Sequence, residues 1–132
     1  MTWDEFEKDI EKLSVKIATP VDVIAPIARG GLIPARVLAT KLHIKTMYAL
    51  TIEKSAGKRQ VVTSINKDLH NKTILLIEDM LESGLSMIAG KEYLESKGAT
   101  VKTACLYILP KTQFMPDYYF RRVTNVTLFP WE

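Results

Sequence analysis

Two adjacent acidic residues and the serine- and glycine-containing loop after them form the most chemically suggestive segment of the chain. Glu78 and Asp79 directly follow a short apolar run, and Ser83, Gly84 and Ser86 come a few residues later. Two hydroxyls, a glycine and the N–H groups at the start of a following helix would suit one phosphate group. The carboxylates could accept hydrogen bonds from a sugar diol or hold a magnesium ion. This segment therefore combines the features of a phosphate site with those of a diol or metal site.

A second candidate anion site is the loop Arg29-Gly30-Gly31. Its guanidinium and flexible backbone amides suit a second phosphate or a pyrophosphate. Each feature also has a plainer explanation, because a Gly-Gly pair after a strand is often only a turn and an acidic pair at a strand end is often solvated. Taken together, two anion sites beside a diol or metal site indicate a ligand with phosphates at both ends of a ribose. Neither loop has the spacing of a Walker P-loop or of a dinucleotide-binding Gly-x-Gly-x-x-Gly turn.

The hydrophobic pattern predicts the strands and helices that would position these two loops. An apolar stripe after a capping-box pair predicts an N-terminal helix, β-branched and apolar runs predict strands, and Gly98 is typical of a helix end. The predicted strands cover residues 21–27, 46–52, 61–65, 73–77 and 101–109. The predicted helices cover the opening segment up to about residue 17, residues 32–42 and residues 85–97. The polar stretch 53–60, which contains Gly57, is predicted to be a loop.

Strands separated by helices of this length predict βαβ units. They indicate an α/β fold with an open, Rossmann-like parallel sheet flanked by helices. In such a sheet, ligands bind beyond the carboxyl ends of the strands. The loops expected there are residues 29–31 and residues 78–86. Both candidate anion sites are therefore expected at the same edge of the sheet.

The length and composition predict one cytoplasmic domain spanning residues 1–132. The chain is 47% hydrophobic and 25% charged, which argues against disorder. The single cysteine, Cys105, excludes a disulfide framework and a cysteine-based zinc site. No apolar run is long enough to span a bilayer, and the acidic N-terminus lacks the features of a signal peptide. The net charge of +3 does not by itself indicate a nucleic-acid partner, although the basic excess leaves one open.

Residues 74–87, Ile-Leu-Leu-Ile-Glu-Asp-Met-Leu-Glu-Ser-Gly-Leu-Ser-Met, resemble the phosphoribosyl-diphosphate motif of the type I phosphoribosyltransferases. That motif has four apolar residues, two acids, two apolar residues, an acid, Ser or Thr, Gly, any residue and Ser or Thr. Residues 27–35 are similar to the pyrophosphate loop of the xanthine-guanine and hypoxanthine branch, and residues 2–4 and 129–132 also resemble that branch. The resemblance extends over essentially the whole chain. It implies the type I phosphoribosyltransferase fold, with a small C-terminal hood at about residues 110–132 together with part of the N-terminus.

The resemblance implies transfer of the 5-phosphoribosyl group from phosphoribosyl diphosphate to a nucleobase, and it favours a 6-oxopurine. The products would be a nucleoside monophosphate and pyrophosphate, as in purine salvage. Mg²⁺ is the implied cofactor, with Asp79 and Glu78 as its ligands and as partners of the ribose hydroxyls. A cis peptide bond between Ala28 and Arg29 would present the pyrophosphate loop, and Arg59 would reach the pyrophosphate from a loop that closes over the site. The full donor-binding set that the resemblance implies is Arg29, Gly30, Gly31, Arg59, Glu78, Asp79, Met80, Leu81, Glu82, Ser83, Gly84, Leu85 and Ser86.

The implied catalytic residues are Arg29 and Glu82, and the implied base-binding residues are Lys111, Val126 and Thr127. Glu82 would accept or relay the proton of the base, and Lys111 would donate to the oxygen at purine position 6. Three features depart from the family pattern. Glu82 replaces the usual aspartate, Val126 stands where an aromatic ring normally stacks on the purine, and the hood is shorter than in the branch it resembles. The base is therefore less constrained by the sequence than the donor.

Two other functions are weighed against this enzyme. A regulatory module that senses phosphoribosyl diphosphate and contacts nucleic acid would use the same fold, but the intact Arg29 loop and the complete donor motif favour the enzyme. A signalling receiver domain also carries an acidic pair, but its acids should follow the first strand. The resemblance further implies a homodimer or a higher homo-oligomer. Trp131 is balanced between a packing role and a contact with ligand in the hood.

Overall fold

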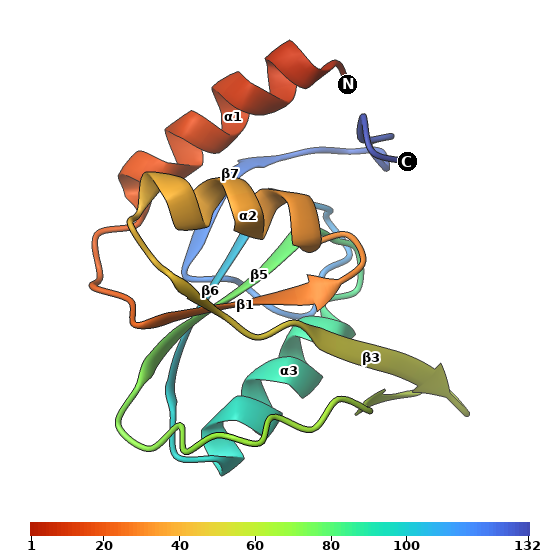
Figure 1. The fold of residues 1–132 in the computed structure, drawn as a ribbon. Coiled ribbons are helices and arrows are strands. Elements are labelled where there is room, and N and C mark those ends of the chain that lie inside the picture. Colours follow the sequence, from red (N-terminus) through yellow and green to blue (C-terminus); the bar gives the residue numbers. More distant parts are fainter.

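A seven-stranded, mostly parallel sheet forms the centre of the computed structural model, which describes residues 1–132 (Figure 1). The strand order is β4-β3-β1-β5-β6-β7, and β2 pairs with β1 outside this path. All neighbouring strands are parallel except β3 and β4. The strands are β1 (Val23–Ala28), β2 (Thr46–Met47), β3 (Leu50–Ser55), β4 (Lys58–Val61), β5 (Thr73–Leu81), β6 (Thr100–Ile108) and β7 (Tyr118–Arg122). The helices are α1 (Trp3–Lys16), α2 (Leu32–Lys41) and α3 (Leu85–Ser96).

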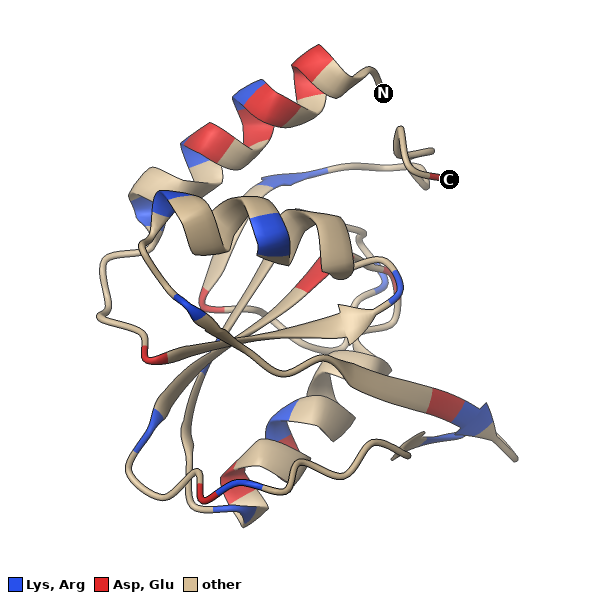
Figure 2. Ribbon diagram, in the orientation of Figure 1, with Lys and Arg blue, Asp and Glu red and all other residues tan.

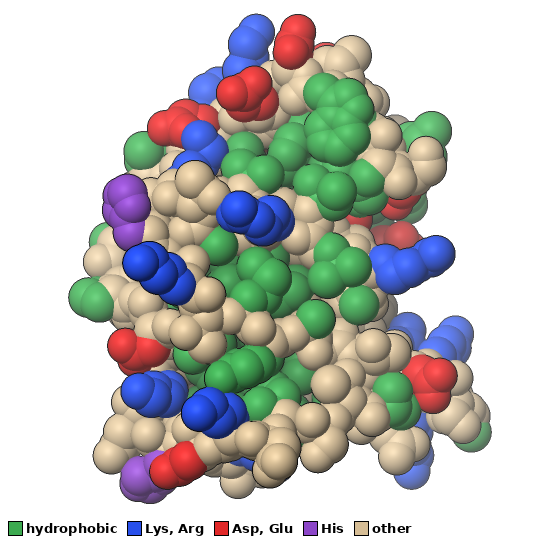
Figure 3. Space-filling model, in the orientation of Figure 1, with side chains coloured by type: hydrophobic (Ala, Val, Ile, Leu, Met, Phe, Trp, Pro, Cys, Tyr) green, Lys and Arg blue, Asp and Glu red, His purple; other side chains and the backbone are tan.

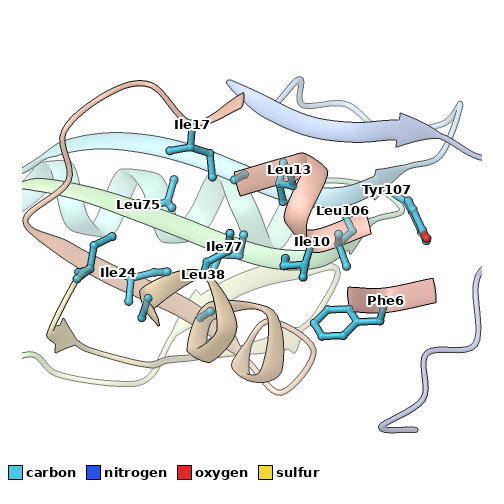
Figure 4. Close-up of a cluster of buried hydrophobic side chains, with 14 of the residues drawn as sticks. Phe6, Ile10, Leu13, Ile17, Ile24, Leu38, Leu75, Ile77, Leu106 and Tyr107 are labelled. Atoms are coloured by element: carbon cyan, nitrogen blue, oxygen red, sulfur yellow. The ribbon is translucent and has the colours of Figure 1, made fainter. Parts of the chain in front are cut away.

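The helices cover both faces of this sheet, with α1 and α2 on one face and α3 on the other (Figure 1). Figure 4 shows the core under the first pair, where Phe6 and Ile10 of α1 and Leu38 of α2 lie against the sheet. Met87 and Leu94 of α3 are fully buried in a second core on the opposite face. Burying one such side chain contributes about 1.5–3 kcal/mol. The predicted α/β architecture is confirmed.

The N-terminal helix forms for the local reasons that its sequence suggests. The Thr2 hydroxyl accepts from the Glu5 N–H at 3.1 Å, and the Glu5 carboxylate accepts from the Thr2 N–H at 2.7 Å. This capping box satisfies two N–H groups that the first turn would otherwise leave unpaired. The predicted apolar stripe is buried against the sheet from Phe6 through Leu13.

The segment predicted to be a loop, residues 53–60, is instead most of a β-hairpin. Strands β3 and β4 pair antiparallel from Ile52 opposite Val61 out to the turn at Ala56 and Gly57. Both turn residues have positive φ, 51° and 78°, which is the geometry that two-residue hairpin turns favour. The hairpin projects from the sheet (Figure 1), and residues 53–60 are almost all exposed and lack large apolar side chains, so no apolar alternation predicts it in the sequence.

Three strand boundaries also differ from the predicted ones. The predicted strand 46–52 is divided into β2 and β3, and only the first residue of the predicted strand 61–65 is in a strand. Strand β5 continues past its buried run to Leu81, because β6 keeps pairing with it there. Glu78 and Asp79 therefore lie within a strand and not in a loop after it.

Charged residues of both signs are mixed over the part of the molecule that Figures 2 and 3 show. Figure 2 shows acidic and basic residues interspersed along α1, and Figure 3 shows basic side chains spread over its face with acidic ones between them. No helix combines the length and the hydropathy that crossing a bilayer requires.

Candidate active site

A cavity of about 530 Å³ opens beyond the carboxyl ends of β1 and β5, at the sheet edge predicted to bind the ligand. The cavity is surrounded by residues of β5, of the loop that follows β5 and of the start of α3. Strand β4 and the chain segments before and after β7 complete its lining. Its lining consists of Gly30, Arg59, Glu78, Asp79, Met80, Leu81, Glu82, Ser83, Gly84, Ser86, Lys111 and Glu132. A second cavity of equal volume near the end of α2 contains none of the predicted site residues.

The loop between β5 and α3 has the backbone shape of an anion site. Gly84 has φ +80° and begins α3, whose N-terminus opens onto the cavity through Ser86. A Cβ at Gly84 would lie 2.8 Å from the Thr112 hydroxyl and 2.9 Å from Phe114 Cβ. Ser83 links the loop to the hood, because its carbonyl accepts from the Gln113 N–H at 2.8 Å. The loop is therefore held in place, with its hydroxyls and helix dipole available to a phosphate.

The pKa values of the acidic pair, Glu78 and Asp79, are raised by their surroundings. Burial, together with smaller contributions from repulsion by Asp79 and Glu82, raises the pKa of Glu78 to about 8. Burial is also the main cause that raises the pKa of Asp79 to about 6, although the Met80 N–H, 2.7 Å from Oδ1, opposes it. Two carboxyls that resist ionisation in an acidic cavity are suited to a ligand that brings positive charge or hydrogen-bond donors.

The raised pKa of Glu78 predicts how stability depends on pH. Between its ordinary value of 4.5 and about 8, the folded protein keeps a proton that the unfolded chain releases. The free energy of unfolding should therefore fall as pH rises through this window, and the loss should be complete above about pH 8. We expect Glu78→Gln, which cannot ionise, to remove the contribution of Glu78 and leave only the smaller pH dependence that the raised pKa of Asp79 produces. The variant should be more stable than wild type by a few kcal/mol at pH 8.5.

Urea unfolding at pH 5 and pH 8.5, without metal or ligand, would measure this effect. Glu92→Gln, at an exposed position on α3, serves as the control and should behave like wild type. Parallel stability changes in wild type and Glu78→Gln between the two pH values would contradict the assignment.

The two glycines of the Arg29-Gly30-Gly31 loop have separate steric roles. A Cβ at Gly30 would lie 2.5 Å from Oδ2 of Asp79, so this glycine leaves room for the carboxylate. A Cβ at Gly31 would lie 2.4 Å from the Ile77 carbonyl, so this glycine lets the loop pack on the strand ends. The Ala28–Arg29 peptide bond is cis, as the resemblance implied. Arg29 itself is exposed and does not line the cavity.

Gly31→Ala should destabilise the protein although alanine fits the local backbone. Gly31 has φ −78° and ψ −11°, which any residue adopts, so the cost is steric alone. The atoms in the way are backbone carbonyls that cannot rotate aside, and we expect a loss of about 3 kcal/mol. Gly57→Ala is the matched contrast, because its Cβ meets nothing within 4 Å and only its positive φ carries a cost, about 1 kcal/mol. Chemical denaturation of both variants would compare them, and an equal loss in the two would contradict this reading.

Glu82 and Lys111, the implied proton acceptor and base reader, lie close together in the lining of the cavity. Lys111 Nζ lies 4.0 Å from Oε2 of Glu82, and both side chains are more than half exposed. Such an exposed pair contributes little to stability. It places an acceptor and a donor side by side at one edge of the cavity, where a flat polar ligand could use both.

The other two predicted base-binding residues do not reach this cavity. Val126 is 61% exposed, and Thr127 lines a separate cavity next to Tyr107 and Arg121. The resemblance implied both residues as base-binding, but the path of the tail keeps them out of the lining of this cavity. Their role in binding the base stays a prediction.

Glu132 lines the cavity and was not predicted as a site residue. Its charge contributes to the raised pKa of Asp79, and its carboxylate accepts from the Phe129 N–H at 3.1 Å. The only signal for it was an acid at the end of the tail segment that resembled the family. Its approach to Asp79 depends on how the tail folds back over the sheet.

A mostly parallel α/β sheet that brings an acidic pair, a helix-start loop and two basic side chains together at one edge has the features of a site for a phosphorylated ligand. The chain belongs to the family of the phosphoribosyl transferase domain, whose model matches residues 2–132. It is 32% identical over 144 residues to the xanthine-guanine phosphoribosyltransferase of Nitratidesulfovibrio vulgaris, and 27% identical over 143 residues to that of Gluconobacter oxydans. Both matches span this whole chain and 83% of the relative.

The solved structures agree with this family. The purine phosphoribosyltransferase of Pyrococcus horikoshii superposes with a TM-score of 0.92 at 33% identity, over 100% of this chain and 92% of that one. The xanthine-guanine-hypoxanthine phosphoribosyltransferase of Helicobacter pylori has a TM-score of 0.84 at 22% identity, over 99% and 90% of the two chains, and supports the fold. The predicted family and fold class are confirmed.

Proposed function

We propose that the protein transfers the 5-phosphoribosyl group from phosphoribosyl diphosphate to a 6-oxopurine and releases pyrophosphate. The observation that carries this proposal is the single cavity that Asp79, the loop 82–86 and Lys111 line together. It offers a diol site, a phosphate site and a donor for a base oxygen next to one another. The similarity to xanthine-guanine phosphoribosyltransferases and to a purine phosphoribosyltransferase supports a purine as the acceptor.

The charges of the cavity support Mg²⁺ as the cofactor. Its lining includes four carboxyl groups and only two cations, Arg59 and Lys111, so the protein alone neutralises little of the charge on a donor with several phosphoryl groups. Mg²⁺ binds through one or two carboxylates together with substrate phosphates and water, and Asp79 with Glu78 provides such a pair. When bound, the ion would neutralise charge on the departing pyrophosphate.

The residues of the cavity would divide the reaction between them. Asp79 and Glu78 accept hydrogen bonds from the ribose hydroxyls and hold the sugar while positive charge develops at its reacting carbon. The hydroxyls of Ser83 and Ser86 and the N-terminus of α3 hold the 5′-phosphate. Arg59, which lines the cavity from strand β4 of the hairpin, would bind the pyrophosphate.

At the acceptor side, the Lys111 ammonium donates to the purine oxygen and Glu82 accepts the proton that the attacking base gives up. Arg29 stays the predicted pyrophosphate partner from its exposed position beside the cavity. The homo-oligomeric state and the cytoplasmic location stay predictions from the sequence.

Calorimetry with phosphoribosyl diphosphate, with and without Mg²⁺, tests the donor half of this function. We expect binding at low micromolar to millimolar dissociation constants with Mg²⁺ and much weaker binding without it. No heat at millimolar donor in the presence of Mg²⁺ would overturn the proposed function.

A further inference from the structure

Lys111 lies in a backbone turn that is tied to the end of strand β5. The Thr112 N–H donates to the Leu109 carbonyl at 3.2 Å and closes the turn. Pro110 follows Leu109, at the turn position that the fixed φ of proline suits. The Leu109 N–H donates in turn to the Leu81 carbonyl at 3.0 Å. The turn therefore holds the backbone of Lys111 in a fixed place, although its side chain is 69% exposed.

The Thr112 side chain shapes the segment that follows this turn. Its hydroxyl donates to the Phe114 carbonyl at 3.0 Å and accepts from the Phe114 N–H at 3.3 Å. Local bonds of this kind fix a loop that has no strand partner. Between these two residues, the Gln113 N–H donates to the Ser83 carbonyl at 2.8 Å. The segment is thus joined to residues 82–86, the phosphate loop, in a shape that the Thr112 hydroxyl maintains.

The same hydroxyl lies close to the backbone of the phosphate loop. A Cβ at Gly84 would lie 2.8 Å from Thr112 Oγ1 and 3.1 Å from the Phe114 nitrogen. Gly84 begins α3, whose N-terminus is the expected site of the 5′-phosphate. Residues 112–114 therefore contact the phosphate loop on one side and continue directly into Lys111 on the other.

We propose that Thr112 is a positioning residue for Lys111, with its hydroxyl fixing the lysine-bearing turn against the phosphate loop. The Lys111 ammonium would then meet the base at a set place relative to the bound 5′-phosphate. This role rests on the proposed function, because it concerns the acceptor half of the same site. The contact of Lys111 with Glu82, at 4.0 Å, is too long and too exposed to fix the lysine by itself. Its placement therefore depends on the backbone of the turn, and catalysis is sensitive to such placement.

Thr112→Val tests this role, because valine keeps the branched shape of the side chain and removes the hydroxyl. We expect the base KM to rise about 10-fold, the effect of one lost hydrogen bond, and the preference for 6-oxopurines over adenine to fall with it. The dissociation constant for phosphoribosyl diphosphate with Mg²⁺ should change by less than about threefold, because the bond from Gln113 to Ser83 does not use the hydroxyl.

Two further variants serve as controls. Thr112→Ser keeps the hydroxyl and should restore the wild-type base KM and selectivity. Thr40→Val removes a hydroxyl that accepts from Arg36 at 2.6 Å on α2, outside the lining of the cavity, and should behave like wild type. Thr112→Ala, which also lacks the hydroxyl, supplies the same comparison if the valine variant does not fold.

A double-variant cycle separates positioning from general packing. In the Lys111→Met background, Thr112→Val should lower kcat/KM for a 6-oxopurine no further, because both changes act on one contact. Additive losses would overturn the role, and so would a lowered melting temperature with wild-type base KM and selectivity. Equal losses in donor affinity and base KM would also overturn it, because the hydroxyl would then serve the phosphate loop and not the lysine. Absence of donor binding by the wild-type protein would instead overturn the proposed function, and this role with it.

Discussion

Asp79→Asn should weaken the binding of phosphoribosyl diphosphate with Mg²⁺ by at least about 100-fold and lower kcat/KM by about 1000-fold, close to 4 kcal/mol of transition-state stabilisation. The reason is that one carboxylate is expected to serve both the ribose diol and the metal, so both interactions weaken together. Asparagine keeps the shape of the side chain, removes its charge and replaces one acceptor oxygen with a donating NH₂ group.

The same substitution should leave the fold intact. Because burial raises the pKa of Asp79 to about 6, a neutral side chain at this position suits the ligand-free protein. The melting temperature without ligand should therefore equal or exceed that of wild type. Asp4→Asn, at an exposed position in the first turn of α1, is the control and should bind the donor normally. Full donor affinity in Asp79→Asn would show that the site is misplaced.

Lys111→Met should lower kcat/KM for 6-oxopurines by about 100- to 1000-fold, since a buried polar contact to the base would be lost in the complex. An ammonium donates to an oxygen at position 6 but cannot accept from the amino group of adenine. Wild type should therefore prefer 6-oxopurines strongly, and Lys111→Met should lose most of that preference.

This effect should appear in activity and not in stability. The contact of Lys111 with Glu82 is long and exposed, so its removal costs little. Lys91→Met provides the control, because Lys91 lies on α3 and pairs only with Glu95, one turn away. Steady-state kinetics with guanine, hypoxanthine, xanthine and adenine would measure both variants. Unchanged selectivity between adenine and the oxopurines in Lys111→Met would contradict the role of this lysine.

The donor side of the site could be predicted from the sequence because its parts are close along the chain. Glu78, Asp79 and the loop to Ser86 lie within nine residues, so their spacing alone conveys which groups meet. The glycine pair after β1 joins them because parallel strands place their carboxyl ends at one edge. Helix α1 could be predicted for the same reason, because its capping box and its row of apolar residues lie within one short segment.

The parts that could not be predicted depend on contacts between distant segments. The β3–β4 hairpin is polar on both sides and owes its strands to pairing, not to a hydrophobic pattern. Val126 and Thr127 were implied by the resemblance, whereas the path of the tail decides which side chains reach the cavity. Glu132 lines the same cavity as Asp79 from more than fifty residues away along the chain, and no local pattern in the sequence predicts this.

The central claim is that this cavity transfers phosphoribosyl groups to a 6-oxopurine. Its most direct test incubates the protein with phosphoribosyl diphosphate, Mg²⁺ and each of guanine, xanthine, hypoxanthine, adenine and uracil in turn, and measures pyrophosphate and nucleoside monophosphate together. We predict equal amounts of both products with one or more of the three 6-oxopurines and little with adenine or uracil. Activity restricted to adenine or uracil would contradict the acceptor assignment. Donor binding without product from any base would contradict the enzyme itself and favour a donor-sensing regulatory role.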